Sequence, residues 1–163
     1  MLFRSGGPST DISLIVNGEP SLAPDRSVGG QKVALNSLDI VSLGAGGGSI
    51  GRVDAGGLLY VGPESAGAQP GPACYGRGGT LATVTDANLV LGYLDAGNFL
   101  GGRAKLDVAA AEGALDRLAK ELKVDRVAAA SGVHRVVNTN MAEGIRLVSV
   151  RRGVDPDRKS TRL

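Results

Sequence analysis

Apolar and polar positions alternate along the first half of the chain, which predicts β-strands joined by turns. Residues 10–16 alternate in this way and are rich in β-branched side chains, and the Asn17-Gly18 pair after them is typical of a two-residue hairpin turn. The stretch KVALNSLDIVSLGAGGGS, residues 32–49, predicts one or two short buried strands that end in a glycine loop. In GRVDAGGLLYVGP, residues 51–63, we expect a hairpin whose turn spans 54–57.

Helical spacing of apolar residues replaces this alternation in the second half. Three stretches there follow a residue that favours a helix N-cap and carry apolar side chains three or four positions apart. The expected N-caps are, in order, Thr85 or Asp86, Asp107 and Asp125. We expect the third helix to run to about Arg151 and to be closed by Gly153 and Pro156. The chain thus places strands and glycine-rich loops first and helices second, which is a mixed α/β class (α+β in this segment).

The composition fits one domain with an aliphatic, alanine-rich core. Of the 163 residues 42% are hydrophobic, but they include only two Phe, three Tyr and no Trp. So few aromatic side chains argue against nucleic-acid modules that stack bases on aromatic rings. Cys74 is the single cysteine, which excludes an internal disulfide and suits a reducing compartment. Because the apolar runs are also too short to span a bilayer, we expect a cytoplasmic protein with no membrane or nucleic-acid partner.

Basic residues are concentrated at the two ends of the sequence. Without residues 1–5 and 157–163 the formal net charge changes from +2 to −1, so the high isoelectric point reflects the ends. The strings LFRS at 2–5 and DRKSTRL at 157–163 both look like translated sequencing-adapter read-through. We therefore expect that these ends are not native and that residues 6–156 are an internal part of a longer domain.

The stretch RSGGPSTD, residues 4–11, has the residue types of a turn that binds phosphate. Its two glycines let backbone N–H groups face an anion, and the Ser-Thr-Asp that follows adds two hydroxyl groups and a carboxylate. The proline between them removes one N–H donor. A Gly-Gly-Pro turn before a strand is also compatible with a plain turn that holds no ligand.

A second glycine-rich loop consists of Gly44, Gly46, Gly47, Gly48 and Ser49. It lacks the Gly-Lys-Ser/Thr ending of a Walker phosphate loop, and the hairpin expected after it differs from the helix of a dinucleotide-binding fingerprint. The loop is either a flexible connector or a place where the backbone approaches a ligand closely. Its position between apolar strands favours the second interpretation.

Other features have weaker claims to chemistry. The Gly- and Pro-rich stretch 61–79 is not expected to contain a regular element. Cys74 within it has no base nearby in the sequence, which favours an inert buried thiol over a nucleophile. His134, the only histidine, lacks the partners of a catalytic triad or a metal site, so a packing or surface role is favoured. Asp86 is interpreted as a helix cap and Asp54 as a turn residue.

The order of these phrases resembles that of the hydantoinase A/5-oxoprolinase family, which includes N-methylhydantoinases and a subunit of acetone carboxylase. The phrases that carry the resemblance are GGPSTDISLI, LDIVSLGAGGGSIGRVDAGGLLYVGPESAGAQPGPACYGRGGTLATVTDANLVLGYL, FLGG and MAEGIRLVSVRRGVDP. The resemblance implies an actin-like, sugar-kinase-like ATPase fold in which two lobes close on a nucleotide. Residues 6–156 would then be a partial hydantoinase A/oxoprolinase domain.

The resemblance also implies roles for individual residues. Family members carry a mid-chain phosphate loop of the form DMGGTSTD, which residues 4–11 match except that Arg-Ser replaces Asp-Met and Pro8 replaces Thr. The residues that would hold the phosphates of ATP are Gly6, Gly7, Ser9 and Thr10. Asp11 would be the catalytic residue and would orient Mg²⁺ or an attacking water. The 44–49 loop would line the cleft near nucleotide or substrate.

The activity that the resemblance implies is ATP-dependent opening of a cyclic amide of the 5-oxoproline or hydantoin type, by phosphorylation of the substrate carbonyl oxygen. ATP and Mg²⁺ are the implied cofactors, and the implied partner is a hydantoinase B-type subunit or fused half. Two alternatives stay open: an ATP-using subunit of an acetone-carboxylase-like enzyme, and a structural or interaction fragment without activity. Because one phosphate loop is found here, we expect the isolated 163 residues not to hydrolyse ATP.

Overall fold

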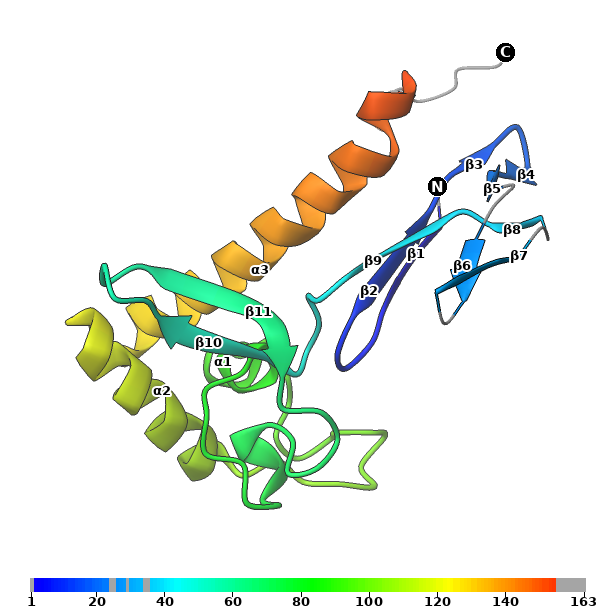
Figure 1. The fold of residues 1–163 in the computed structure, drawn as a ribbon. Helices are drawn as coiled ribbons and strands as arrows, with labels where there is room; N and C mark the ends of the chain where they lie inside the picture. The colour runs from blue at the N-terminus through cyan, green and yellow to red at the C-terminus, as the bar shows by residue number, and fades with distance from the viewer. Residues whose placement is uncertain (1, 24–25, 29, 34–35, 155–163) are drawn as a thin grey trace, which may run out of the picture.

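The computed structural model of this chain describes residues 2–23, 26–28, 30–33 and 36–154. Helix α3 (Arg126–Val148) runs through the molecule and joins two β-structures (Figure 1). A three-stranded sheet lies against its C-terminal half, and a β-hairpin with helices α1 (Val84–Val90) and α2 (Val108–Leu122) surrounds its N-terminal half. The mixed α/β class expected from the sequence, with strands first and helices second, is confirmed.

The three-stranded sheet is antiparallel, with strand order β1-β2-β9. Its strands are β1 (Leu2–Ser5), β2 (Thr10–Ser13) and β9 (Ile40–Leu43). Ile12 is fully buried and packs with Val148 of α3. The helix comes closest at Gly144, where a Cβ atom would lie 3.1 Å from Ile12 Cδ1 and still closer to the side chain of Leu43. Gly144 therefore permits close helix packing, which is one of the two effects that a glycine in this helix can have.

Three small strand pairs connect β2 to β9. They are β3 (Ile15–Val16) with β4 (Glu19–Pro20), β5 (Leu22–Ala23) with β8 (Ser37–Leu38), and β6 (Arg26–Val28) with β7 (Gln31–Val33). Asn17 and Gly18 join β3 to β4 with φ values of 52° and 85°, so the predicted two-residue hairpin is confirmed. The prediction of buried strands over 32–49 is wrong for Leu38, which is 46% exposed.

Strands β10 (Ser49–Val53) and β11 (Leu59–Ser65) form the predicted second hairpin. Asp54 is its turn residue, as expected, and its Oδ1 accepts hydrogen bonds from the N–H groups of Gly56 and Leu58 at 2.8 and 2.9 Å. The stretch 61–79 does contain regular structure, contrary to the prediction. Strand β11 takes up its first residues, and a short 3₁₀-helix, η1 (Ala73–Tyr75), follows.

The start of α1 differs from the sequence prediction, whereas the starts of α2 and α3 agree with it. Thr83 is the N-cap of α1, and Asp86 is the third helical residue, whose carboxylate accepts from the Thr83 N–H in a capping box. Asp107 and Asp125 cap α2 and α3 as predicted.

At its C-terminal end α3 stops at Val148 and gives way to a 3₁₀ turn, η2 (Val150–Arg152), which Gly153 closes at φ 73°. The helix is therefore shorter than the predicted end near Arg151. Pro156, the other predicted terminator, lies outside the described residues.

The main core lies where α1, α2 and α3 meet the β10–β11 hairpin. Among the described residues its buried members are small or aliphatic, which confirms the expected alanine-rich core: Ala45, Val61, Ala73, Ala82, Val84, Ala87, Ala114, Leu115, Leu118, Ala130, Val133 and Val137. This core fixes the start of α1 and the end of β9, and the two glycine-rich loops lie between them.

Candidate functional site

The turn between β1 and β2, residues 6–9, lies directly against the 44–49 loop. The Gly47 N–H donates to the Gly6 carbonyl at 3.2 Å, and the Gly48 N–H donates to the Gly7 carbonyl at 2.8 Å. A Cβ atom on Gly46 would lie 2.5 Å from the Gly6 oxygen, which no real side chain tolerates. The structure thus brings together the two loops that the sequence singled out, and it shows why the second one is built from glycine.

Two hydroxyl side chains hold the loops in this arrangement. Thr10 is completely buried, and its Oγ1 donates to the Ala45 carbonyl at 2.6 Å. Ser49 is also buried, and its Oγ accepts from the Gly46 N–H at 2.9 Å. Neither hydroxyl faces solvent, and both hold the loops together; contact of Thr10 with phosphate and of Ser49 with nucleotide or substrate stays a prediction.

Helix α1 anchors the 44–49 loop from the other side. The Gly47 carbonyl accepts two hydrogen bonds from Thr85, one from its N–H and one from its Oγ1, each at 2.8 Å. The first turn of α1 therefore positions Gly47, and Gly47 in turn contacts Gly6. The sequence did not reveal this role, because Thr85 was considered only as a helix cap.

The 6–9 turn has hydrogen-bond donors without a protein partner, which indicates an anion site. The Gly6 N–H closes the turn by donating to the Ser9 carbonyl at 2.8 Å, so this group is not available to phosphate as the sequence suggested. Within the described residues the N–H groups of Gly7 and Ser9 have no partner, and Gly7 is exposed. Neighbouring unpaired N–H groups in a turn form a concave site for phosphate or carboxylate oxygens. The proline at the tip supplies no donor.

The N–H groups of the 44–49 loop are used differently. Those of Gly46, Gly47 and Gly48 are all bonded to protein oxygens. The loop therefore uses these N–H groups to support the 6–9 turn, and its approach to nucleotide or substrate stays a prediction.

Asp11 stands beside this turn on β2. It lies opposite Arg4 of β1 and Ser42 of β9 in the strand register, and its Oδ1 accepts from the Ser42 hydroxyl at 2.6 Å. The side chain is half-buried, so the carboxylate is oriented but open to water. No group of three or more His, Cys, Asp or Glu able to hold a metal occurs in the described part of the chain. Asp11 therefore fits Mg²⁺ only in the manner typical of nucleotide sites, where one or two carboxylates act together with phosphates and waters.

Asp86 is a buried carboxylate with a structural task. It accepts hydrogen bonds from the N–H groups of Ala73, Cys74 and Thr83 at 3.2, 2.8 and 3.0 Å, and from the Thr83 hydroxyl at 2.7 Å. These bonds tie the 72–74 segment to the start of α1. The sequence suggested Asp86 as a candidate N-cap, whereas the structure makes it the third helical residue of the capping box. The sequence did not indicate its link to the loop 12 residues away.

Cys74 and His134 take the structural roles that the sequence favoured. Cys74 is fully buried, and burial together with the nearby Asp86 carboxylate raises the pKa of its thiol. The thiol is thus protonated and shielded, unlike a nucleophile. The His134 ring bonds to Asn88 through Nδ1 at 3.0 Å and to Asn138 through Nε2 at 2.8 Å, and it stacks on Tyr93 with centroids 4.9 Å apart.

Comparison with known proteins identifies the family. The sequence model of the hydantoinase/oxoprolinase family matches residues 1–162, so the chain belongs to the hydantoinase/oxoprolinase family. It is 46% identical over 152 residues to caprolactamase subunit alpha from Pseudomonas jessenii. This alignment covers 93% of this chain and 22% of that protein. It is 41% identical over 129 residues to 5-oxoprolinase 1 from Arabidopsis thaliana, covering 76% of this chain and 10% of the relative.

Solved structures agree with this assignment. The nucleotide-free structure of acetone carboxylase, described as carrying out ATP-dependent acetone carboxylation, superposes with a TM-score of 0.85 at 32% identity and covers 94% of this chain and 22% of that chain. The crystal structure of the ATP-dependent caprolactamase from Pseudomonas jessenii gives a TM-score of 0.82 at 46% identity, with 93% and 22% coverage. The chain therefore spans about a fifth of the length of these relatives. In the described residues no helix is long and apolar enough to cross a membrane.

Proposed function

We propose that this chain forms one side of the nucleotide site in an ATP-dependent enzyme that opens a cyclic amide, within an actin-like, sugar-kinase-like fold. One observation carries the proposal. The 6–9 turn presents two unpaired N–H groups beside an oriented carboxylate, and a second glycine-rich loop anchored by α1 holds the turn in place. A donor pair of this kind suits the oxygens of a transferring phosphoryl group.

Each residue has a defined part in this proposal. The N–H groups of Gly7 and Ser9 donate to phosphate oxygens, while Gly6 closes the turn. Asp11 holds a metal-bound water or orients the attacking one, and Ser42 fixes the rotamer of Asp11. Mg·ATP, when bound, supplies the phosphoryl group that turns an amide carbonyl oxygen into an activated leaving group. Thr10 keeps the turn seated on the 44–49 loop.

The relatives support the choice of substrate class. Caprolactam and 5-oxoproline are both cyclic amides, and two of the matching relatives are a caprolactamase subunit and a 5-oxoprolinase. We propose a cyclic amide as the substrate, and a second subunit or fused half as the partner that completes hydrolysis. Reaction in the cytoplasm would give access to ATP and would keep the single thiol reduced.

A second candidate is the ATP-using subunit of a ketone carboxylase. The TM-score of 0.85 to acetone carboxylase favours it. We propose phosphoryl transfer to a carbonyl oxygen for both candidates, so the 6–11 segment has the same role in each. The described residues contain one phosphate turn of this kind, and we expect the isolated chain to bind nucleotide weakly without turnover; steady phosphate release by the isolated chain would contradict this.

A chimera tests the proposal. In caprolactamase subunit alpha, the 152 aligned residues are replaced by those of this chain, and the chimera is assembled with the remainder of that enzyme. We expect ATP-dependent ring opening of caprolactam. Asp11→Asn in the chimera should lower kcat by roughly 10²-fold or more, a loss typical of removing one group that stabilises developing charge.

The matched control is Asp54→Asn, which changes a turn carboxylate on the other hairpin. It should leave kcat within twofold of the parent chimera. Equal activity of the Asp11→Asn and Asp54→Asn chimeras would refute the assignment of Asp11. A chimera that opens the lactam without ATP would refute the nucleotide role.

A further inference from the structure

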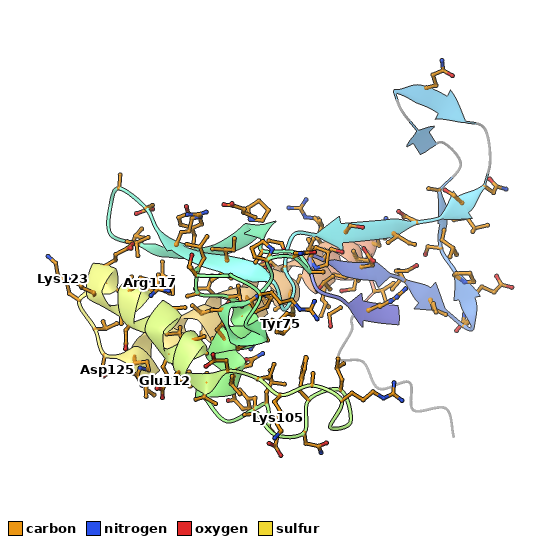
Figure 2. The ribbon with its side chains drawn as sticks, turned by 90° about the horizontal axis from the view of Figure 1, so that it is seen from below. Tyr75, Lys105, Glu112, Arg117, Lys123 and Asp125 are labelled. Atoms are coloured by element: carbon orange, nitrogen blue, oxygen red, sulfur yellow. The ribbon has the colours of Figure 1, made fainter. Side chains whose placement is uncertain are left out.

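A pocket on the described surface is separate from the 6–11 segment. It has a volume of about 210 Å³ and lies between the end of η1 and the loop that leads into α2. Figure 2 shows Tyr75 and Lys105 on these two neighbouring segments. The residues that shape the pocket include Tyr75, Arg77, Phe99, Leu100, Lys105 and Leu106.

The walls of the pocket are apolar and aromatic. The rings of Tyr75 and Phe99 lie 5.7 Å apart at an angle of 40°. Leu106 is buried behind them in a small core with Cys74. Leu100 is 67% exposed at the rim, so a bound apolar group would cover a large side chain that water now surrounds.

The loop that forms one wall is ordered by backbone hydrogen bonds. The N–H groups of Ala104 and Leu106 donate to the carbonyls of Phe99 and Ala96 at 3.2 and 2.9 Å. Leu100 is held at φ 53°, a left-handed conformation that is unusual for a side chain of this size. Strained residues of this kind occur often at ligand sites. The pocket is thus preformed, which lowers the entropic cost of binding.

Two cationic side chains give the pocket a positive charge. Arg77 and Lys105 are exposed, and within the described residues neither has an ion-pair or hydrogen-bond partner. Burial raises the pKa of Tyr75, and its phenol is engaged in a side-chain hydrogen bond with Thr85 at the start of α1, so the ring and not the hydroxyl faces a ligand in this proposal.

We propose that this pocket binds a small organic monoanion, a carboxylate with an aromatic or aliphatic body. The two cations would hold the carboxylate, and the Tyr75 and Phe99 rings would pack on the body. The volume is below the roughly 300–1,000 Å³ of drug-sized sites, which limits the ligand to about ten non-hydrogen atoms. This inference does not depend on the proposed nucleotide site, because none of its residues belongs to the 6–11 or 44–49 segments.

The test is a ¹⁹F NMR titration of the 163-residue chain with 4-fluorobenzoate, and with its neutral analogue 4-fluorobenzamide as a shape-matched control. We expect saturable binding of the acid with a Kd on the order of 1 mM. The amide should bind at least fivefold more weakly. Equal binding of acid and amide would overturn the proposal, as would a fluorobenzoate effect that leaves the ring signals of Tyr75 and Phe99 unchanged.

Variants localise the site. Lys105→Met and Arg77→Met should each weaken fluorobenzoate binding roughly tenfold, the usual loss for one charge-assisted hydrogen bond. Lys120→Met, which removes an exposed cation on α2, is the control and should change nothing. Circular dichroism verifies that every variant is folded. Equal weakening by Lys120→Met and Lys105→Met would refute a specific site.

A competition experiment distinguishes binding of an organic carboxylate from binding of a simple inorganic anion. Inorganic phosphate at the concentration of the fluorobenzoate should not displace it, since phosphate has no apolar body to pack on the rings. Displacement by equimolar phosphate would refute the amphiphilic ligand class.

Discussion

The most informative single substitution is Thr10→Val. Valine has the shape of threonine, so the change removes only the Oγ1 hydroxyl, which donates to the Ala45 carbonyl at 2.6 Å in a fully buried position. The Ala45 carbonyl would then lie buried without a donor among the described residues. Leaving such an acceptor unpaired costs about 1–3 kcal/mol. With a urea m-value of about 1.5 kcal/mol/M, a loss of about 2 kcal/mol lowers the unfolding midpoint by roughly 1 M.

The matched control is Thr139→Val in α3. The Thr139 hydroxyl also donates to a carbonyl, that of Arg135 at 2.9 Å, but the side chain is exposed and lies within a helix. Its loss should change the free energy of unfolding by less than about 0.5 kcal/mol. Urea unfolding followed by circular dichroism compares the two variants. The reasoning would be refuted if both variants lost the same stability, or if Thr10→Val lost none.

Three further predictions follow from the same contacts. Gly46→Ala should cost about 1–3 kcal/mol of unfolding free energy, because its Cβ would lie 2.5 Å from the Gly6 oxygen. The control, Gly113→Ala in α2, meets only an ordinary contact at 3.8 Å and should stabilise the fold by roughly 0.5–1 kcal/mol. An unchanged unfolding midpoint in urea for Gly46→Ala would contradict the loop contact. Asp86→Asn should cost at least about 1.5–3 kcal/mol, since an amide NH₂ would face buried N–H donors, and a loss below 0.5 kcal/mol would argue against the four bonds. Burial raises the pKa of the Cys74 thiol in the folded chain, so its contribution to stability is full below the unfolded thiol pKa of about 8.5. Above that pH the unfolding free energy falls by up to about 1.4 kcal/mol per pH unit. Cys74→Ala should remove this dependence of unfolding free energy on pH, and identical pH profiles of the variant and the parent chain would contradict it.

Elements with strong local signals were predictable from the sequence. The Asn17-Gly18 turn and the caps Asp107 and Asp125 have residue types that satisfy backbone groups locally, and all three are confirmed. The N-cap of α1 was not predicted, because Thr83, Thr85 and Asp86 can each cap a helix. Tertiary bonds from Asp86 to the 72–74 segment decide among them, and the sequence contains no local signal for such bonds.

The sequence predicted which segments form the candidate site, but not which role each residue has within it. Both glycine loops were identified, and the structure places them in contact. The sequence could not show that Thr10 is buried, that Gly47 donates its N–H to protein, or that Thr85 holds the loop. These roles depend on which neighbour each group meets in three dimensions. The pocket beside Tyr75 was also missed, because its residues form no motif and come from the end of η1 and from a separate loop.

The central claim is that the 6–9 turn binds phosphate through the N–H groups of Gly7 and Ser9. Its most direct test is a ¹H–¹⁵N NMR titration of the ¹⁵N-labelled chain with Mg·ATP. The account predicts that the amide signals of Gly7 and Ser9 shift most, and that those of Gly47 and Gly48, which already donate to protein, shift less. Unchanged Gly7 and Ser9 signals at a nucleotide concentration that saturates shifts elsewhere in the chain would contradict it.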